Sequence, residues 1–216
     1  LIITHAHEDH IGAVGHFWPL LRCPVYATPF AAEMLETRLD EAGILGRVSL
    51  ETVEAGDELD LAPFDIELIP VNHSVPEAVS LLIRTKYGNI FHTGDWRFDD
   101  TPVVGKPANY ARFKELGKEN VLAMVADSTN VFVENDILSE SDVKDSLTTL
   151  FSRYSGKRLV VTCFASNVGR IESIAEAAEK NGRTVCLLGR SLWRVEGAGR
   201  ACGYFRGINV FLTDEE

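Results

Sequence analysis

Leu1-Ile-Ile-Thr-His5-Ala-His7-Glu-Asp9-His10 is the stretch that decides the fold class of this chain. An apolar run typical of the end of a buried strand stops in three histidines and two carboxylates within six residues. A helix-like pattern starts directly afterwards, over residues 11–15. Catalytic and ligand-binding side chains of α/β proteins collect at such strand-to-helix turns. The stretch therefore predicts an α/β protein with a functional site at this turn.

The spacing of these side chains indicates a metal site. In an extended turn His5 and His7 point the same way and can share one ion, whereas Asp9 and His10 lie where the chain begins to coil and can reach a second ion. Imidazole together with carboxylate suits zinc or a similar divalent metal. A merely polar turn is the alternative, but so many ligands at alternating spacing argue against it.

Two further ligands are expected at the ends of later strands. His73 lies in a loop and supplies the third histidine of an open zinc site, while Asp95 at the tip of an apolar strand can bridge both ions. A hydrogen-bonded loop histidine and an Asx-turn aspartate are the alternatives. His16, on a helix after the motif, and His92, which alternates with the strand that leads to Asp95, are left out of the ligand set.

Composition is that of a soluble globular protein. Apolar residues make up 45% and charged residues 25% of the 216, mean hydropathy is near zero, and no apolar run is long enough to span a bilayer. The sequence contains no Cys-x-x-Cys pair, so its cysteines are expected to be reduced, mostly buried thiols of a cytoplasmic protein, with disulfides as the alternative. These cysteines are Cys23, Cys163, Cys186 and Cys202.

The net charge of −11 is unevenly distributed. Residues 1–139 carry 10 Lys+Arg and 22 Asp+Glu, a balance of −12, whereas residues 140–216 carry 11 and 10, a balance of +1. A nucleic-acid partner is therefore compatible with the charge only through a local basic surface.

The order of elements changes near residue 139. Before it the pattern predicts strands at 24–28, 49–53, 64–71, 79–84, 90–93 and 121–126 with helices at 29–39 and 110–116. After it a helix from Ser139, a buried strand at 158–164, a helix at 167–181, a strand at 183–188 and a further helix follow one another. This α-β-α-β-α order is Rossmann-like, so we expect one domain over residues 1–139 and a second over 140–216.

The chain begins inside a strand without an initiator methionine, so it is expected to be an internal piece of a longer protein.

Several motifs resemble a known family. His5-Ala-His-Glu-Asp-His10, His73 and Thr93-Gly-Asp95 form the ligand pattern of the metallo-β-lactamase fold. The longer wording of four segments resembles the β-CASP ribonucleases of the RNase J group, and the resemblance extends over essentially the whole chain. These segments are His73-Ser-Val-Pro-Glu77, Thr93-Gly-Asp-Trp-Arg-Phe-Asp-Asp-Thr-Pro102, Ala126-Asp-Ser-Thr-Asn130 and Phe164-Ala-Ser-Asn-Val168. The resemblance implies a partial αββα sandwich followed by the start of an inserted Rossmann-like β-CASP domain.

The same resemblance implies a metal-dependent ribonuclease, a 5′–3′ exonuclease and endonuclease of RNA processing and decay. It implies two divalent ions, zinc before manganese, RNA as partner, a cytoplasmic location, and a homodimer or homotetramer. The metal ligands are expected to be His5, His7, Asp9, His10, His73 and Asp95. The catalytic carboxylates are expected to be Asp9, Asp95 and Asp127, the last orienting a ligand histidine or the water.

A polar shelf beside Asp127 is expected to receive the phosphates of the substrate. It consists of Ser128, Asn130, Ser166 and Asn167. Hydroxyls, amides and a helix N-terminus are suitable phosphate partners, and ordinary capping and turn roles are the alternative.

The sequence also departs from the family pattern. The downstream Ser-Gly-His and Pro-x-His-Gly motifs, which supply an acid or phosphate contact and complete the second metal site in the family, are not present. The second ion would therefore have only Asp9, His10 and Asp95, and the piece is expected to be inactive by itself. A DNA nuclease, a thioester or lactam hydrolase of the same fold, and a non-catalytic binding protein remain alternatives. The Rossmann-like segment after residue 139 favours the nucleic-acid group.

Overall fold

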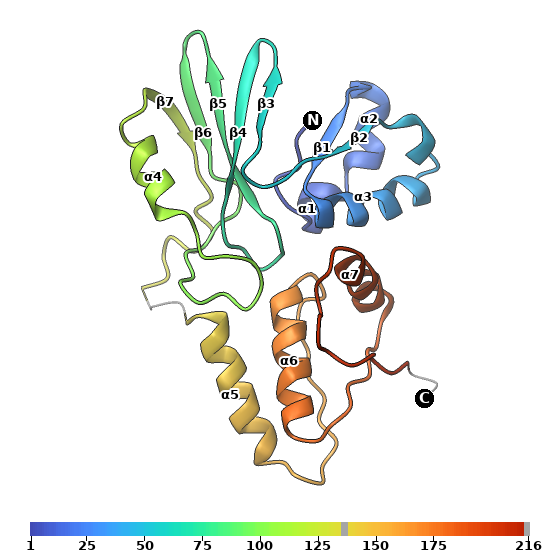
Figure 1. Cartoon of the computed structure of the whole chain (residues 1–216). Helices are drawn as coiled ribbons and strands as arrows, with labels where there is room; N and C mark the ends of the chain where they lie inside the picture. The colour runs from blue at the N-terminus through green and yellow to red at the C-terminus, as the bar shows by residue number, and fades with distance from the viewer. Residues whose placement is uncertain (135–137, 214–216) are drawn as a thin grey trace.

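The computed structural model describes residues 1–134 and 138–213 and has a mixed α/β architecture, as predicted. The larger sheet has five strands. Figure 1 shows this sheet, a smaller N-terminal unit of strands and helices beside it, and the C-terminal helices below both. Within the described residues, no helix combines the length and apolar character needed to cross a membrane.

The five-stranded sheet has the order β3-β4-β5-β6-β7, with antiparallel neighbours except for the parallel pair β6–β7. Its strands are β3 Glu58–Leu61, β4 Phe64–Pro70, β5 Val79–Thr85, β6 Gly88–His92 and β7 Val121–Val125. Alternation along β4 places Ile66 and Leu68 in one apolar cluster, and Ile69 in another that includes Leu116 of α4 (Tyr110–Leu116). The sequence patterns predicted β4 to β7, but β3, whose residues alternate acidic and apolar, was missed.

The N-terminal unit holds the opening motif. Its elements are α1 Glu8–Ile11, α2 Val14–Leu21, β1 Val25–Ala27, α3 Pro29–Glu41, the 3-10 turn Leu45–Arg47 and β2 Leu50–Thr52. Strands β1 and β2 pair in parallel. The expected strand at the chain start is reduced to one bridge, between Ile2 and Tyr26. Pro29 occupies the first turn of α3, where its missing N–H costs no hydrogen bond.

The three C-terminal helices lie where the sequence placed them: α5 Glu140–Ser152, α6 Val168–Lys180 and α7 Arg190–Ala201. Helix α5 opens on a capping box, in which Ser139 Oγ accepts the Ser141 N–H and Asp142 Oδ2 accepts the Ser139 N–H. Helix α7 packs against α3, and the largest buried cluster contains residues of the N-terminal unit together with residues of α6 and α7.

The two strands expected between these helices are corrected by the structure. Residues 158–164 form no strand and are largely exposed, with Val160 at 82% and Phe164 at 85%. Within the described residues, 183–188 pair with a later segment through the single bridge between Cys186 and Leu212. A strand needs a neighbour to take its backbone hydrogen bonds, and no other described strand segment makes backbone hydrogen bonds with 158–164.

The cysteine prediction was correct in one respect and wrong in another. All four thiols are free. None is fully buried, however, because Cys186 is exposed and the other three are half-buried.

Candidate metal centre

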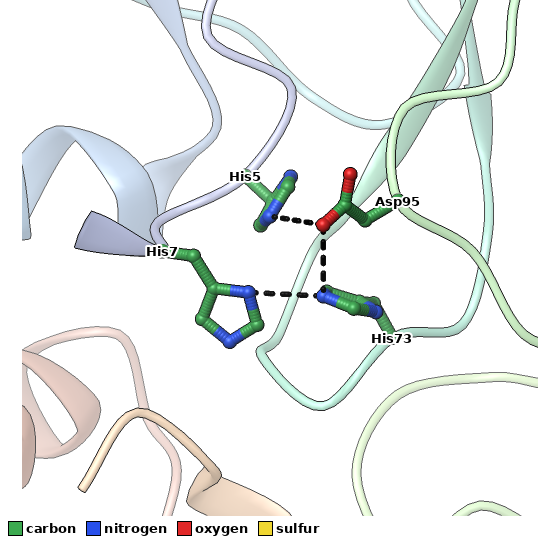
Figure 2. A group of neighbouring side chains, drawn as sticks. All are labelled: His5, His7, His73 and Asp95. Carbon is green, nitrogen blue, oxygen red and sulfur yellow. Dashed lines mark hydrogen bonds and ion pairs between the residues drawn. The ribbon is translucent and has the colours of Figure 1, made fainter. Parts of the chain in front are cut away.

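The predicted ligands come from three separate segments that meet where β6 ends. His5 and His7 lie between the Ile2 bridge and α1, and α1 carries the next two ligands in its first turn. His73 lies in the loop between β4 and β5, and Asp95 follows β6. Figure 2 shows the imidazoles of His5 and His73 directed at the carboxylate of Asp95, and that of His7 directed at His73.

His5, His7, His73 and Asp95 form a first candidate group. Asp95 Oδ2 lies 3.6 Å from His5 Nε2 and 3.7 Å from His73 Nε2. His73 Nε2 in turn lies 2.9 Å from His7 Nδ1 (Figure 2). Nitrogens bound to one tetrahedral zinc at about 2.0–2.1 Å are separated by roughly 3.3 Å, so this spacing fits a single ion.

Asp9, His10 and Asp95 form a second candidate group. His10 Nε2 lies 3.6 Å from Asp9 Oδ2 and 3.5 Å from Asp95 Oδ1. The two oxygens of Asp95 therefore face different groups, Oδ2 the first and Oδ1 the second. The bridging role predicted for Asp95 requires such an arrangement, with four candidate donors in one group and three in the other.

The electrostatics of the histidines suit metal binding. His5 is fully buried, and its Nε2 has no hydrogen-bond partner among the described residues. Burial, followed by the neighbouring imidazoles of His10, His73 and His7, lowers the pKa of His5 to about 2. Burial also lowers the pKa of His7, and with the help of His7 it lowers the pKa of His73 to about 4. A divalent ion binds to the ring lone pair of a neutral imidazole, so these residues fit the metal implied by the motif.

Two hydroxyls beside the ligands were not identified from the sequence. Thr4 Oγ1 lies 3.1 Å from His5 Nδ1, and Ser74 Oγ lies 3.2 Å from His7 Nε2. Each hydroxyl contacts the ring nitrogen that faces away from the candidate ion. The available signal was their position in the chain, since each directly precedes or follows a predicted ligand.

The histidines left out of the ligand set lie elsewhere. His92 Nδ1 accepts the N–H of Gly94 at 3.0 Å, so that nitrogen is engaged in the turn that leads to Asp95. His16 is exposed on α2.

Asp127 lies beside the metal ligands without belonging to either group. Thr93 Oγ1 accepts its backbone N–H at 3.0 Å, which ties the end of β7 to the end of β6. Its Oδ1 accepts the N–H and the hydroxyl of Thr129, at 2.8 and 2.6 Å, and these bonds hold the pKa of Asp127 below its usual range. The negative charge of Asp127 acts on His73, whose pKa it raises against the effect of burial.

The predicted phosphate shelf is divided between two places. Ser128 and Asn130 are exposed after β7, while Ser166 and Asn167 are half-buried before α6. Asn167 Oδ1 accepts the Arg170 N–H at 2.9 Å and so caps α6, which is the alternative role considered for it. Asn167 also lines a small cleft together with residues of the His73 loop.

A polar network connects the tip of β6 to the C-terminal helices along this cleft. Asp99 is buried and accepts bonds from Arg97 Nη2 at 2.9 Å, Ser139 Oγ at 2.6 Å and the Glu140 N–H at 3.1 Å. Glu140 in turn accepts two hydrogen bonds from Arg170. A carboxylate at the first turn of α5 also interacts favourably with the helix dipole. The network therefore holds α5 and α6 beside the loop that carries Asp95.

The His73 loop has its own anchor. Glu77, at a positive φ of 60°, accepts the N–H of Phe30 at 2.7 Å and the hydroxyl of Tyr204 at 2.7 Å. These bonds join the loop to the first turn of α3 and to the segment after α7. Burial and the bond to Glu77 raise the pKa of the Tyr204 hydroxyl.

Comparisons with known proteins agree with these features. Residues 1–111 match the beta-lactamase superfamily domain, and residues 156–216 match the Ribonuclease J beta-CASP domain. Ribonuclease J of Sinorhizobium meliloti is 45% identical over 216 residues, which are 100% of this chain and 38% of that protein. Ribonuclease J 1 of Streptococcus pyogenes serotype M3 is 36% identical over 206 residues, which are 95% of this chain and 36% of that protein.

The fold is shared with a solved structure of low sequence identity. A protein of unknown function from Enterococcus faecalis V583 aligns with a TM-score of 0.65 at 18% identity, over 99% of this chain and 54% of that one.

The chain spans well under half the length of the curated relatives it matches. The matched domains and relatives confirm the resemblance of the motifs: the chain belongs to the RNase J group of the metallo-β-lactamase/β-CASP superfamily.

Proposed function

We propose that the chain supplies the metal-binding part of a ribonuclease that hydrolyses RNA phosphodiester bonds in RNA processing and decay, by 5′–3′ exonucleolytic and endonucleolytic cleavage. The observation that carries the proposal is the division of Asp95 between two ligand groups, Oδ2 facing His5 and His73 and Oδ1 facing His10. Two ions that share a carboxylate are typical of enzymes that cleave phosphodiesters. The chain covers 38% of its Sinorhizobium meliloti relative, so the activity is proposed for the longer protein.

Zinc is the proposed metal at both positions, with manganese as the alternative. His5, His7 and His73 with Asp95 would hold one ion, and Asp9 and His10 with Asp95 would hold the other. When bound, two such ions supply positive charge for the phosphoryl oxygens and lower the pKa of a bound water to near 7. Imidazole-rich sites suit zinc, whereas manganese favours oxygen ligands, and this difference makes zinc our first choice.

The chain's own residues would position the substrate around this centre. Asp127 stays ionised, and its negative charge attracts the His73 imidazole and raises the pKa of that ring. We therefore assign Asp127 the role of holding that imidazole in place. Asn167 uses Oδ1 for the helix cap, which leaves its Nδ2 as a donor toward a phosphate. Ser166 adjoins it, and Ser128 and Asn130 form the facing, exposed part of the shelf.

The wider assignments follow from the same proposal. Residues 1–139 form the metal-binding domain and residues 140–216 the start of the inserted domain, which faces the centre across the cleft beside Asn167. The longer protein acts in the cytoplasm as a homodimer or homotetramer. We expect the chain by itself to be inactive, because its sequence does not contain the Ser-Gly-His and Pro-x-His-Gly motifs that in the family supply an acid or phosphate contact and complete the second metal site.

The test combines metal analysis with RNA cleavage. A longer protein containing this chain should bind two zinc ions and degrade 5′-monophosphorylated RNA, and His7→Ala should abolish cleavage while the fold is retained. His16→Ala is the matched control, since His16 is exposed on α2 and contacts no ligand group. Unchanged turnover in His7→Ala would refute the proposal, and cleavage of a lactam or thioester instead of RNA would assign the centre to another hydrolase of this fold.

A further inference from the structure

His5 is held in one ring orientation by the residue before it. Thr4 Oγ1 lies 3.1 Å from His5 Nδ1, and both side chains are buried. The opposite nitrogen, Nε2, lies 3.6 Å from Asp95 Oδ2 and has no hydrogen-bond partner among the described residues. A neutral imidazole has one N–H, so a ring that donates from Nδ1 to a hydroxyl presents the lone pair of Nε2 to the centre.

His7 is held in the opposite sense. Its Nε2 lies 3.2 Å from Ser74 Oγ, while its Nδ1 lies 2.9 Å from His73 Nε2. Donation from Nε2 to the serine leaves the lone pair of Nδ1 directed at the centre. The two adjacent histidines of the motif thus offer different ring nitrogens, and each has a hydroxyl at the other nitrogen.

Thr4 is itself fixed by its surroundings. Its carbonyl oxygen accepts the N–H of Val79 at 3.0 Å. Its Cβ and Cγ2 atoms lie 3.5 and 3.7 Å from the position of a Cβ on residue 94, so its side chain packs against Gly94. A β-branched side chain has restricted χ1 angles, and these contacts on two sides leave the hydroxyl directed at His5.

We propose that Thr4 and Ser74 are positioning residues that select the metal-binding nitrogen of His5 and of His7, Nε2 and Nδ1 respectively. Each hydroxyl accepts the N–H of the ring it contacts and thereby fixes both tautomer and ring angle. The inference rests on the proposed metal centre, and it assigns to this centre two side chains that are not ligands. Outer partners of this kind commonly change metal affinity by about 10- to 100-fold when they are removed.

Binding of the metal alone tests the proposal with the full chain. Zinc affinity is measured by competition with a chromogenic chelator, and the visible absorption of the Co²⁺-substituted chain reports the ligand geometry. Thr4→Val keeps the branched shape without the hydroxyl and should weaken zinc binding about 10-fold or more and alter the Co²⁺ spectrum. Ser74→Ala should do the same at a half-buried loop position, where folding is less at risk.

Two further variants make the test specific. Thr4→Ser keeps the hydroxyl and should bind zinc nearly as tightly as the original chain. Thr37→Val, whose hydroxyl contacts its own helix at Glu33, should leave affinity and spectrum unchanged.

Three results would overturn the inference. Zinc affinity and Co²⁺ spectrum that stay unchanged in Thr4→Val and Ser74→Ala, even with a lower melting temperature, would mean that the hydroxyls only support packing. Equal losses of affinity in Thr4→Val and Thr4→Ser would exclude the hydroxyl as the cause. If the original chain binds no zinc, the proposed metal centre fails together with the inference.

Discussion

The carbonyl oxygen of Val79 lies 2.7 Å from the position that a Cβ atom on Gly94 would occupy. The backbone of residue 94 therefore approaches β5 more closely than any side chain allows, and its φ of +59° lies in the left-handed region. This approach places the following residue, Asp95, next to His5. Glycine at 94 is thus a geometric requirement of the metal centre.

Gly94→Ala should be strongly destabilising. The left-handed conformation costs a non-glycine residue roughly 1 kcal/mol, and the overlap with the Val79 oxygen forces the turn to shift, so we expect a total loss of about 2 kcal/mol or more in the free energy of unfolding. Urea denaturation measures it. Gly43→Ala is the control, because Gly43 has φ +68° with nothing within 4 Å of the added carbon and should lose about 1 kcal/mol. Equal losses in the two variants would contradict the steric argument.

Asp95→Asn should impair both ligand groups. The amide carries no charge and presents one oxygen in place of two, whereas the carboxylate of Asp95 faces His5 with Oδ2 and His10 with Oδ1. Metal content after dialysis, measured by mass spectrometry, should fall from two equivalents to below one.

Asp9→Asn should affect the second group alone. Asp9 is 79% exposed, lies near His10 and is not a member of the four-donor group. One tightly bound equivalent should remain, with its affinity unchanged. Loss of both ions in this variant would show that the two groups do not bind independently.

The stability of the metal-free chain should fall as the pH is lowered from 7 to 4. The pKa of His73 is about 4 in the folded chain against 6.5 in the unfolded chain, so below pH 6.5 the unfolded chain takes up a proton that the folded chain does not. The contribution of His73 to the free energy of unfolding is therefore fully present above pH 6.5, and it declines by about 3 kcal/mol by pH 4. His5, with a pKa of about 2, contributes in the same direction and over a wider window.

Urea denaturation of the chelator-treated chain at a series of pH values measures the slope of the unfolding free energy against pH. His73→Gln should flatten it, while His16→Gln at an exposed position should leave it unchanged. A slope that is the same in all three chains would contradict the assignment to His73.

Glu140→Gln should loosen the contact between α5 and α6. Arg170 donates to Glu140 from Nε at 2.6 Å and from Nη2 at 3.1 Å, and the Glu140 side chain is 9% exposed. Loss of the charge-assisted pair should cost about 1 kcal/mol, a value limited by the partial exposure of Arg170. Lys180→Gln removes an exposed partner of Glu176 and should change stability by less than about 0.5 kcal/mol. Thermal unfolding of both variants distinguishes the pairs.

The local elements were largely predictable because their signals are local. Pro29 starts α3, the capping pair of Ser139 and Asp142 starts α5, and Asn167 with Gly182 bounds α6. The predictions of strands at 158–164 and 183–188 were wrong because a strand depends on a distant segment as well as on its own residues. An apolar run expresses a tendency to be extended, but a strand exists only where a second segment accepts its hydrogen bonds, and the described part of the chain provides one bridge at Cys186.

The sequence by itself determined the family and the identity of the candidate ligands, because the spacing of His5, His7, Asp9 and His10 is a property of the covalent chain. Tertiary structure alone decided how they are shared. It placed the two oxygens of Asp95 on different groups and set the hydroxyls of Thr4 and Ser74 against opposite ring nitrogens. Orientation of a ring or a carboxylate depends on contacts between distant segments, and only packing brings those segments together.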